Sequence, residues 1–318
     1  MPRFSVIIPC YNASSVIKRG LEALNNQTYK DFEVIIVDDC STDNSCEVVN
    51  TCIEEMAIPI RLLKNEVNSG PGFSRNQGIK AAQGKYLCFL DSDDYFDTCY
   101  FEYLSKQIEE TNSDVVFWGN YQVIGDKIRI INTINYSKEE YIALSPGALW
   151  KFCSLSSLWN GIEMPAIKNA EDIAVIPVIL SKAKKITSIP NLLYYYIHSN
   201  SSLSCTYKPE VSYSFITSFE YTERMMDGLN YHDELEFHGI KTILYGSTLN
   251  ALKAGMKSQE IKNIWDGFTQ KYPQWYNNKY IAAYPKNKRI FLRLVKGKHV
   301  YLLKMYSIFH SALLRYLG

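Results

Sequence analysis

The sequence has 318 residues, an apolar fraction of 47% and a formal net charge of +1. This composition supports a globular protein with a sizeable core and excludes a disordered chain. A net charge near zero says nothing about nucleic acid or membrane partners, so any argument from charge has to be local. We expect no nucleic acid partner. No run of about eighteen uncharged apolar residues occurs, so no membrane span is expected. The short apolar run at the N-terminus does not fit a signal peptide.

The first half of the chain alternates β-rich runs with helical patterns. Asn12 is expected to cap a helix that reaches residue 24, because apolar residues recur at helical spacing after it. Further helices are predicted over residues 43–56, 73–82 and 97–108. This order predicts a mostly parallel sheet with helices on both faces. The predicted strands lie at residues 4–8, 33–37, 60–63, 86–90 and 115–118.

The pattern becomes weaker after residue 119. Loops and short strands are expected there, followed by a helix at residues 170–183 and a strand at residues 192–197. From about residue 210, long helical patterns rich in Tyr, Leu and Lys run to the end. We therefore expect an α/β region over residues 1–210 and a helical C-terminal region over residues 211–318.

Polar and acidic residues follow four of the predicted strands. In open α/β sheets, ligands bind beyond the carboxyl ends of the strands. If these ends lie on one edge, their carboxylates repel one another, and a divalent cation would relieve the repulsion. Asp91 and Asp93 would then bind Mg²⁺ or Mn²⁺ together with a diphosphate. The alternative is that these acids only cap the next helix. The four segments are Pro9–Asn12, Asp38–Ser41, Asn68–Gly72 and Asp91–Asp94.

Three further residues are candidates for nucleotide contacts. The carboxylate of Asp39 can accept a hydrogen bond from a ring N–H or a ribose hydroxyl, and the ring of Tyr11 can stack on a base. Arg75 lies one turn into the helix after the Gly-rich segment, where it can reach a phosphate or a base. The alternatives are an ordinary aromatic residue at Tyr11 and a solvated helix arginine at Arg75.

Taken together, four sequence blocks resemble family 2 inverting glycosyltransferases with the GT-A fold. The blocks occur in the family's order and spacing and cover residues 4–95. The resemblance implies an α/β, Rossmann-like, mostly parallel sheet and a hexosyltransferase that uses a nucleotide diphosphate sugar, in particular a UDP-sugar. It also implies a divalent cation (Mn²⁺ or Mg²⁺), a glycan or lipid-linked glycan acceptor, and a bacterial surface polysaccharide pathway such as capsule or lipopolysaccharide. The blocks are Ser5–Asn12, Val37–Asp43, Gly72–Gly78 and Leu90–Asp94.

The resemblance implies roles for individual residues. Asp93 would be the main metal ligand, Asp91 would lie nearer to the ribose or the sugar and also ligate the metal, and His198 would reach the metal or the diphosphate. Residues 1–95 would form the nucleotide-sugar part of the catalytic domain and residues 96–210 the acceptor part. The residues expected to contact the nucleotide sugar are Pro9, Tyr11, Asn12, Asp39, Arg75, Asp91 and Ser92.

An acidic pair further along the chain resembles the family's catalytic base. By this resemblance Asp172 would deprotonate the acceptor hydroxyl, and a position at a helix N-terminus favours its anionic form. Trp159 resembles the family's tryptophan near the acceptor, where Glu171 would also lie. The segment 161–170 is shorter than in many relatives, which leaves the shape of the acceptor pocket open. The alternative is that both acids only satisfy the first helical turn.

The C-terminal segment is basic, with no acidic residue after Asp266. Its basic residues would share one face of a continuous helix, which suits a helix lying on an anionic membrane surface. The alternative is an amphipathic helix that packs on the catalytic domain, and Gly297 would break the helix in two. The expected location is cytoplasmic, peripheral on the inner face of the membrane, and cysteines within apolar runs favour a reducing compartment. The face comprises Arg289, Arg293, Lys296, Lys304, Ser307, Ser311 and Arg315.

Three other functions are alternatives to a glycosyltransferase. The segment Gly70–Gly72 faintly resembles a dinucleotide fingerprint, but it follows the third strand and its glycine spacing is wrong for an oxidoreductase. A phosphotransferase with Asp91 as nucleophile would leave the Asp38-Asp39 pair unexplained. A non-catalytic nucleotide- or sugar-binding module is disfavoured because the acidic motifs are complete.

Overall fold

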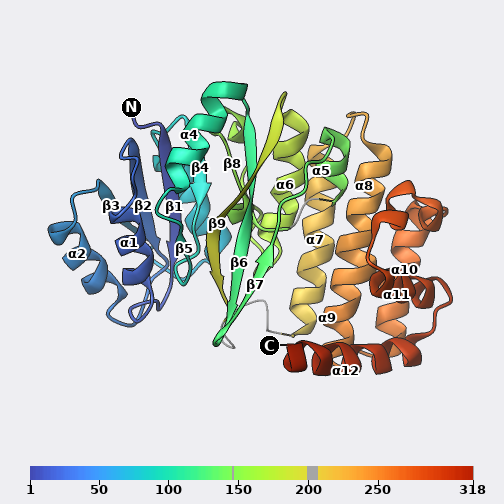
Figure 1. Cartoon of the computed structure of the whole chain (residues 1–318). Helices are drawn as coiled ribbons and strands as arrows, with labels where there is room; N and C mark the ends of the chain where they lie inside the picture. The colour runs from blue at the N-terminus through green and yellow to red at the C-terminus, as the bar shows by residue number, and fades with distance from the viewer. Residues whose placement is uncertain (145–146, 199–206, 318) are drawn as a thin grey trace. The chain divides into compact units, whose positions relative to one another are not determined.

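The computed structural model describes residues 1–144, 147–198 and 207–317, and the chain divides into two compact units (Figure 1). The described residues within 1–135, 148–166 and 182–199 form the first unit. Those within 136–147, 167–181 and 200–318 form the second unit. The helical region expected after residue 210 therefore belongs to one unit with two earlier segments of the chain. The assignment of functions to residues 1–210 and 211–318 stays a prediction.

The first unit is built on one sheet. In the part of the chain that the structure describes, the sheet has nine strands. Eight of them follow the order β3-β2-β1-β4-β8-β6-β9-β5, and the ninth, β7, pairs with β6. β1 is parallel to both β2 and β4, with Phe4 opposite Phe32 and Tyr86. The strands are β1 (Phe4–Cys10), β2 (Phe32–Asp38), β3 (Ile60–Lys64), β4 (Tyr86–Phe89), β5 (Tyr95–Phe96), β6 (Val115–Ile124), β7 (Lys127–Ile131), β8 (Phe152–Leu155) and β9 (Ile186–Ile197).

The predicted parallel order holds for β3-β2-β1-β4, and the sheet is mixed beyond β4. β8 is antiparallel to both β4 and β6, while β6 and β9 run parallel. β6 and β7 form a hairpin whose two-residue turn contains Gly125 at φ 56°, and a positive φ at such a turn suits the twist of the flanking strands. The antiparallel strands fall in the region where the sequence pattern becomes weak.

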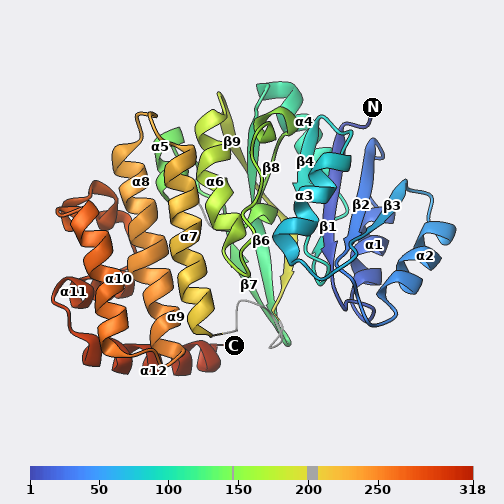
Figure 2. The ribbon, with the colours of Figure 1, turned by 180° about the vertical axis from the view of Figure 1, so that it is seen from behind.

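Helices cover both faces of this sheet, as predicted. The helices α1 (Ile17–Asn25), α2 (Ser45–Glu55) and α4 (Tyr100–Thr111) share a core with the inward residues of β1 and β2 on one face. The rings of Phe32 and Phe101 stack there with centroids 4.4 Å apart. Helix α3 (Pro71–Ala81) packs on the opposite face, which is turned towards the viewer in Figure 2. This packing places the start of α3 beside the ends of β1 and β2.

The cap predicted at Asn12 was wrong. Helix α1 begins at Ile17 and has Val16 at its N-cap, without a side-chain cap. Asn12 instead adopts a φ of 47°, and its Oδ1 accepts a hydrogen bond of 2.8 Å from the backbone N–H of Thr42. Its own N–H donates to Ser41 Oγ at 2.9 Å. Asn is favoured both at caps and at positive φ, and here it ties the loop after β1 to the loop after β2.

The second unit is helical. Its helices surround a core of large apolar side chains that includes Phe237, Trp265 and Phe291, and the helices are seen from two sides in Figures 1 and 2. The elements are α5 (Lys138–Leu144), α6 (Glu171–Lys182), α7 (Pro209–Met225), α8 (His232–Gly239), a π-helix (Ile240–Ser247), α9 (Thr248–Lys253), α10 (Ser258–Lys271), α11 (Lys286–Lys296) and α12 (Val300–Leu317).

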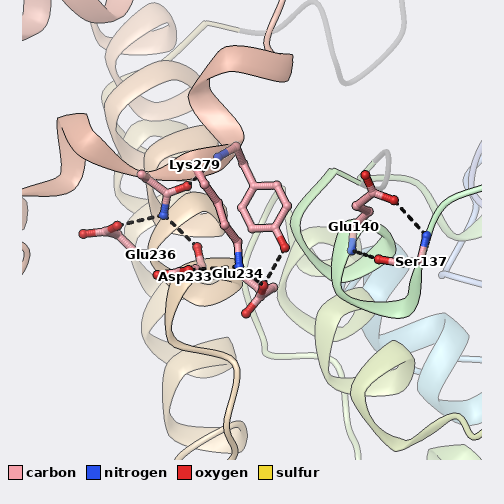
Figure 3. A network of polar contacts seen from close by, with 8 residues as sticks. Ser137, Glu140, Asp233, Glu234, Glu236 and Lys279 are labelled. Carbon is pink, nitrogen blue, oxygen red and sulfur yellow. Dashed lines mark hydrogen bonds and ion pairs between the residues drawn. The ribbon is translucent and has the colours of Figure 1, made fainter.

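Polar contacts fix the surface of this unit (Figure 3). Lys279 Nζ lies 2.9 Å from Asp233 Oδ2 and 3.3 Å from Glu234 Oε1 at the start of α8. At the start of α5, Ser137 N–H donates to Glu140 Oε2 and Glu140 N–H donates to Ser137 Oγ, which forms a capping box. The negative charges of α8 also lie in its first turn, where the helix dipole favours them. These groups therefore stabilise helix starts.

The C-terminal helices α11 and α12 are separate, because the chain turns after Lys296. Gly297 ends α11 as expected, so the basic residues of α11 and α12 do not share the face of one continuous helix. The side chains of Ser311 and Arg315, which were assigned to that face, lie outside the described residues. No helix among the described residues is long and apolar enough to cross a membrane.

Both helices bury one side. Phe291, Leu292 and Leu303 are fully buried in the core of the second unit. On its other side α11 exposes Ile290 together with the basic residues Arg289 and Arg293, whereas α12 exposes apolar side chains. We call the exposed apolar residues Ile290, Tyr301, Leu302, Met305 and Ile308 the C-terminal apolar face.

Candidate functional site

The ends of β1, β2 and β4 meet at one edge of the sheet. These strands are neighbours and run parallel, with Cys10 opposite Asp38 in the register. The backbone N–H of Asp39 donates to the carbonyl of Cys10 at 2.8 Å, so the two chain segments remain paired where they leave the sheet. The structure therefore brings the polar segments after these strands to the same edge.

Asp39 organises the loop that leads into α3. Its side chain is only 3% exposed, and its Oδ1 accepts hydrogen bonds from Asn65 Nδ2 at 2.8 Å and from Ser69 N at 3.0 Å. Its Oδ2 accepts from Gly70 N at 2.7 Å. Gly70 has a φ of 87°, a conformation that favours glycine. A carboxylate with one acceptor position still open can hold this loop and also receive one donor from a ligand.

The acidic segment after β4 concentrates negative charge. Asp91 forms an ion pair with Arg75 of α3, with 2.7 Å between Oδ1 and Nη2. Burial raises the pKa of Asp93, and the charge of Asp91 raises it further. Burial and then Asp91 also raise the pKa of Asp94 to about 8. The surroundings of Asp93 and Asp94 therefore disfavour the ionised forms of these two carboxyl groups.

The end of β9 fastens this segment. Tyr194 Oη donates to Asp94 Oδ2 at 2.6 Å, and Ile197 N–H donates to Asp94 Oδ1 at 2.7 Å. Asp91 N–H donates to Tyr194 Oη at 3.3 Å. His198 follows directly, and its backbone N–H is bonded to the carbonyl of Val123 at 2.9 Å. His198 therefore follows directly after Ile197, the residue whose N–H bonds to Asp94.

The remaining predicted nucleotide contacts differ in exposure. The side chain of Tyr11 is 48% exposed at the end of β1, which leaves a ring face accessible for stacking. Pro9 and Ser92 are half-buried, and Asn12 is exposed but has the structural hydrogen bonds described above. The roles assigned to these residues stay predictions.

Trp159 is explained by packing within the first unit. Its side chain is 4% exposed, its Nε1 donates to Ser154 Oγ at 3.0 Å, and its ring lies 5.2 Å from that of Phe89. Little of the indole surface is left for an acceptor. The contact with an acceptor stays a prediction.

Glu171 and Asp172 begin α6 in the second unit. Glu171 is buried and Asp172 is half-buried. Within that unit, α7 fixes the first turn of α6, because Ser218 Oγ donates to the carbonyl of Ala170 at 2.9 Å and Thr222 Oγ1 donates to that of Ala174 at 2.8 Å. Both acids thus lie in the first turn of α6.

The acidic segment fits a divalent cation that a phosphate helps to hold. Among the described residues, no group of three or more His, Cys, Asp or Glu side chains is placed to bind a metal alone. Magnesium, however, usually takes one or two carboxylates and completes its shell with phosphates and water. A cation at Asp91 and Asp93 would also offset the repulsion that raises the pKa of Asp93.

Arg19 is a residue that the sequence analysis missed. Its guanidinium donates to the carbonyl of Asp93 and lies 5.3 Å from the ring centroid of Tyr95. The glycine next to it, Gly20, is the sequence signal for this close approach. A Cβ at Gly20 would lie 2.9 Å from the carbonyl oxygen of Asp94. Helix α1 therefore runs close against the acidic segment and provides a positive charge beside it.

Comparisons of the sequence identify related proteins. The model of glycosyl transferase family 2 matches residues 5–161. WfaP of Escherichia coli, a UDP-Glc:α-D-GlcNAc-diphosphoundecaprenol β-1,3-glucosyltransferase, is 34% identical over 212 residues, which are 63% of this chain and 80% of WfaP. TarS of Staphylococcus aureus, a poly(ribitol-phosphate) β-N-acetylglucosaminyltransferase, is 30% identical over 213 residues, which are 62% of this chain but 35% of TarS.

Two solved structures share the fold. Residues 1–349 of TarS, solved in complex with UDP-GlcNAc, match with a TM-score of 0.72 at 22% identity and cover 98% of this chain and 92% of that chain. The mannosyltransferase PcManGT from Pyrobaculum calidifontis, solved with GDP-Man and Mn²⁺, matches with a TM-score of 0.53 at 14% identity and covers 95% and 86%. These matches confirm the predicted GT-A fold.

Proposed function

This chain belongs to glycosyl transferase family 2 and is a glycosyltransferase, and we propose that it transfers a sugar with inversion from a UDP-sugar to a glycan or lipid-linked glycan. The observation that carries the proposal is the shared edge of β1, β2 and β4, where Asp39 and the segment Asp91–Asp94 emerge from adjacent parallel strands. Its relatives WfaP and TarS act in the synthesis of bacterial polysaccharides, which supports a surface polysaccharide such as capsule or lipopolysaccharide as the product.

The donor binds at this edge. Tyr11 stacks on the uracil, and the remaining acceptor position of Asp39 receives its N–H. Asp93 and Asp91 would hold Mn²⁺ or Mg²⁺ together with the diphosphate, and Asp91 would also lie near the ribose or sugar. When bound, such a cation would supply charge stabilisation for the leaving diphosphate. UDP is favoured because TarS was solved with UDP and with UDP-GlcNAc, and a metal because PcManGT was solved with Mn²⁺.

Asp172 acts as the general base. It takes the proton from the acceptor hydroxyl as that oxygen attacks the anomeric carbon, opposite to the leaving diphosphate. The N-terminal position on α6 supports this role, because a negative charge is favourable in the first turn of a helix. General-base help of this kind contributes about 10²–10⁴-fold to a rate. His198 assists at the metal or the diphosphate, and Arg75 keeps Asp91 in position.

A screen of nucleotide diphosphates tests the donor. Thermal unfolding would be followed with UDP, GDP, ADP and dTDP, each with Mn²⁺ and with a chelator. We expect UDP and Mn²⁺ together to raise the melting temperature more than either alone, because the cation and the diphosphate bind as one unit. Stabilisation by another nucleotide would overturn the choice of uracil, and the absence of any nucleotide effect would overturn the proposal.

The C-terminal apolar face binds an anionic membrane surface. Tyr301, Leu302, Met305 and Ile308 are between 50% and 78% exposed on one side of α12. Basic side chains lie on the same two helices, and no acidic residue follows Asp266. Exposed apolar side chains combined with lysine and arginine are typical of helices that lie in a membrane interface. A lipid-linked acceptor would require the enzyme to work at such a surface.

Vesicle binding tests this part with point variants. Deleting residues 286–318 would expose the core around Phe291, so we would replace Leu302, Met305 and Ile308 together by serine. Co-sedimentation with phosphatidylglycerol vesicles should fall, because less apolar area is buried on binding. A control replaces the exposed Ile128 and Ile130 of β7 by serine. Equal binding by both variants would contradict the assignment.

A further inference from the structure

The second unit contains a cavity that the proposed catalytic steps do not use. Its volume is about 310 Å³, and residues of α5, α6, α7, α8, the π-helix and α11 line it. Three of its lining side chains are basic, namely His238, Lys241 and Lys288, and the described residues that line it include no carboxylate. A cavity lined by basic groups without acids is suited to an anion.

Aromatic rings hold one of the basic groups in place. Lys288 Nζ lies 4.8 Å from the ring centroid of Tyr245 and 4.9 Å from that of Tyr284, and both rings line the cavity. Cation–π contacts at this distance position an ammonium group and leave its N–H donors available in other directions. Lys288 is therefore a preorganised donor at the wall of the cavity.

His238 supplies an independent observation. It is 3% exposed, and its Nδ1 has no hydrogen-bond partner among the described residues, although it lines the cavity. Its Nε2 lies 3.4 Å from Thr222 Oγ1. A buried polar atom without a partner is costly, and a ligand in the cavity would give Nδ1 that partner.

The basic groups disfavour one another when the cavity holds no anion. Burial lowers the pKa of Lys241 to about 7, and the charge of Lys288 lowers it further. Burial also lowers the pKa of Lys288 and keeps that of His238 well below its usual value. A bound anion would oppose all three effects, because it favours the protonated form of each group.

The backbone beside the cavity is unusual. Lys241 and Tyr245 belong to the π-helix Ile240–Ser247, a rare element that occurs frequently at functional sites. Gly246 also lines the cavity, and a Cβ there would lie 3.2 Å from Phe215 Cε1 and 3.3 Å from the carbonyl of Lys241. The wider turn and the glycine together bring Lys241 and Tyr245 to the cavity wall.

We propose that this cavity binds a phosphate ester of the acceptor, with Lys241 and Lys288 as its cationic donors and His238 as a further polar contact. Ile173, the residue after the proposed base Asp172, lines the cavity, so the phosphate would anchor the acceptor beside the start of α6. The identification of the phosphate bearer as the acceptor rests on the proposed function, whereas the binding of a phosphate ester does not.

Binding of glycerol 3-phosphate tests the site directly. Calorimetry would be done on the full chain with Mn²⁺ and saturating UDP present, so that the donor site is filled and does not contribute. We would compare wild type with Lys241→Met and Lys288→Met, and glycerol would serve as the uncharged probe. Lys286→Met is the matched control, because Lys286 is exposed on the same helix and does not line the cavity. Lys288→Arg keeps the positive charge, and UDP binding in the presence of Mn²⁺ shows whether each Met variant is still folded.

We expect wild type, Lys286→Met and Lys288→Arg to bind glycerol 3-phosphate and not glycerol. Each cavity Met variant should bind it about tenfold to a hundredfold more weakly, which is the usual contribution of a charge-assisted hydrogen bond. UDP affinity in the presence of Mn²⁺ should stay unchanged in all variants. Equal affinity of the cavity variants and the control, or binding of inorganic phosphate without glycerol 3-phosphate, would overturn the proposal.

A vesicle arm separates an acceptor phosphate from a lipid headgroup. Phosphatidylglycerol vesicles should bind the cavity variants as strongly as wild type, because the C-terminal apolar face is intact in them. Loss of vesicle binding in Lys241→Met or Lys288→Met would mean that the cavity takes a membrane headgroup, which would overturn its assignment to the acceptor. If wild type did not bind UDP, the proposed function would be refuted, whereas the proposal of a phosphate site would be unaffected.

Discussion

Replacement of Asp39 tests whether one carboxylate both folds a loop and binds the donor. The side chain accepts three hydrogen bonds, from Asn65 Nδ2, Ser69 N and Gly70 N. Each hydrogen bond to a charged group contributes about 1.5–3 kcal/mol, and some of this is recovered when water enters a loop near the surface. We therefore expect Asp39→Ala to lower the free energy of unfolding by about 3–5 kcal/mol.

A loss of this size is easily measured. At about 2–4 °C for each kcal/mol, Asp39→Ala should lower the melting temperature of the first unit by roughly 6–20 °C. Asp39→Asn should lose less, because its amide oxygen still accepts from one backbone N–H. Both variants should bind UDP more weakly than wild type. Scanning calorimetry with and without UDP would measure the two effects together.

Asp126→Ala is the matched control, because Asp126 is exposed in the turn between β6 and β7. It should melt with wild type and bind UDP normally. If Asp39→Ala also melted with wild type, the three hydrogen bonds would contribute nothing and the magnitude derived from them would be refuted. Weaker UDP binding at an unchanged melting temperature would leave only the ligand role of Asp39.

Two further changes probe the base and the packing of α3. Asp172→Asn should lower kcat by about 10²–10⁴-fold while the affinity for UDP stays the same, because it removes only a proton acceptor. Steady-state rates and calorimetry would measure the two quantities. Near wild-type turnover would exclude Asp172 as the base. Gly78→Ala should destabilise the first unit by about 1–3 kcal/mol, because its Cβ would lie 2.5 Å from Ile7 Cγ2. In Gly267→Ala the new Cβ meets nothing within 4 Å, so urea unfolding should show a gain of up to about 1 kcal/mol; equal effects of the two substitutions would contradict the packing described for α3.

The elements of the first unit were predictable where local and long-range requirements agree. The run Phe32–Asp38 is buried throughout on both faces of the sheet, and the near-continuous apolar sequence of residues 33–37 already indicated a buried parallel strand. The strands β1 and β4 were predicted as well, and the structure brings the acidic segments after β2 and β4 to the one edge that the metal hypothesis requires. Short strands were expected after residue 119 without definite bounds, and β7 and β8 lie there. The strand β5 was not predicted, because it has only two residues and pairs with β9, far along the chain.

The site was predictable in its acids and not in the groups that position them. Asp93 and Asp94 stand in a recognisable block, but Arg19 of α1 donates to the carbonyl of Asp93 and Tyr194 of β9 donates to Asp94. Sequence spacing does not indicate such contacts. Asn12 misled because an asparagine before an apolar helix usually caps it. The cavity around Lys241 was invisible for a related reason, since a π-helix has the same apolar pattern as an α-helix over so few residues.

Binding of UDP as a function of Mn²⁺ concentration tests the central claim most directly. Calorimetry on wild type, Asp93→Ala and the control Asp126→Ala would give the affinity for UDP at each metal concentration. We predict that Mn²⁺ strengthens binding to wild type and to Asp126→Ala, and that Asp93→Ala loses this dependence. UDP affinity that does not respond to Mn²⁺ in wild type, or that responds equally in Asp93→Ala, would contradict a metal-held diphosphate at this edge of the sheet.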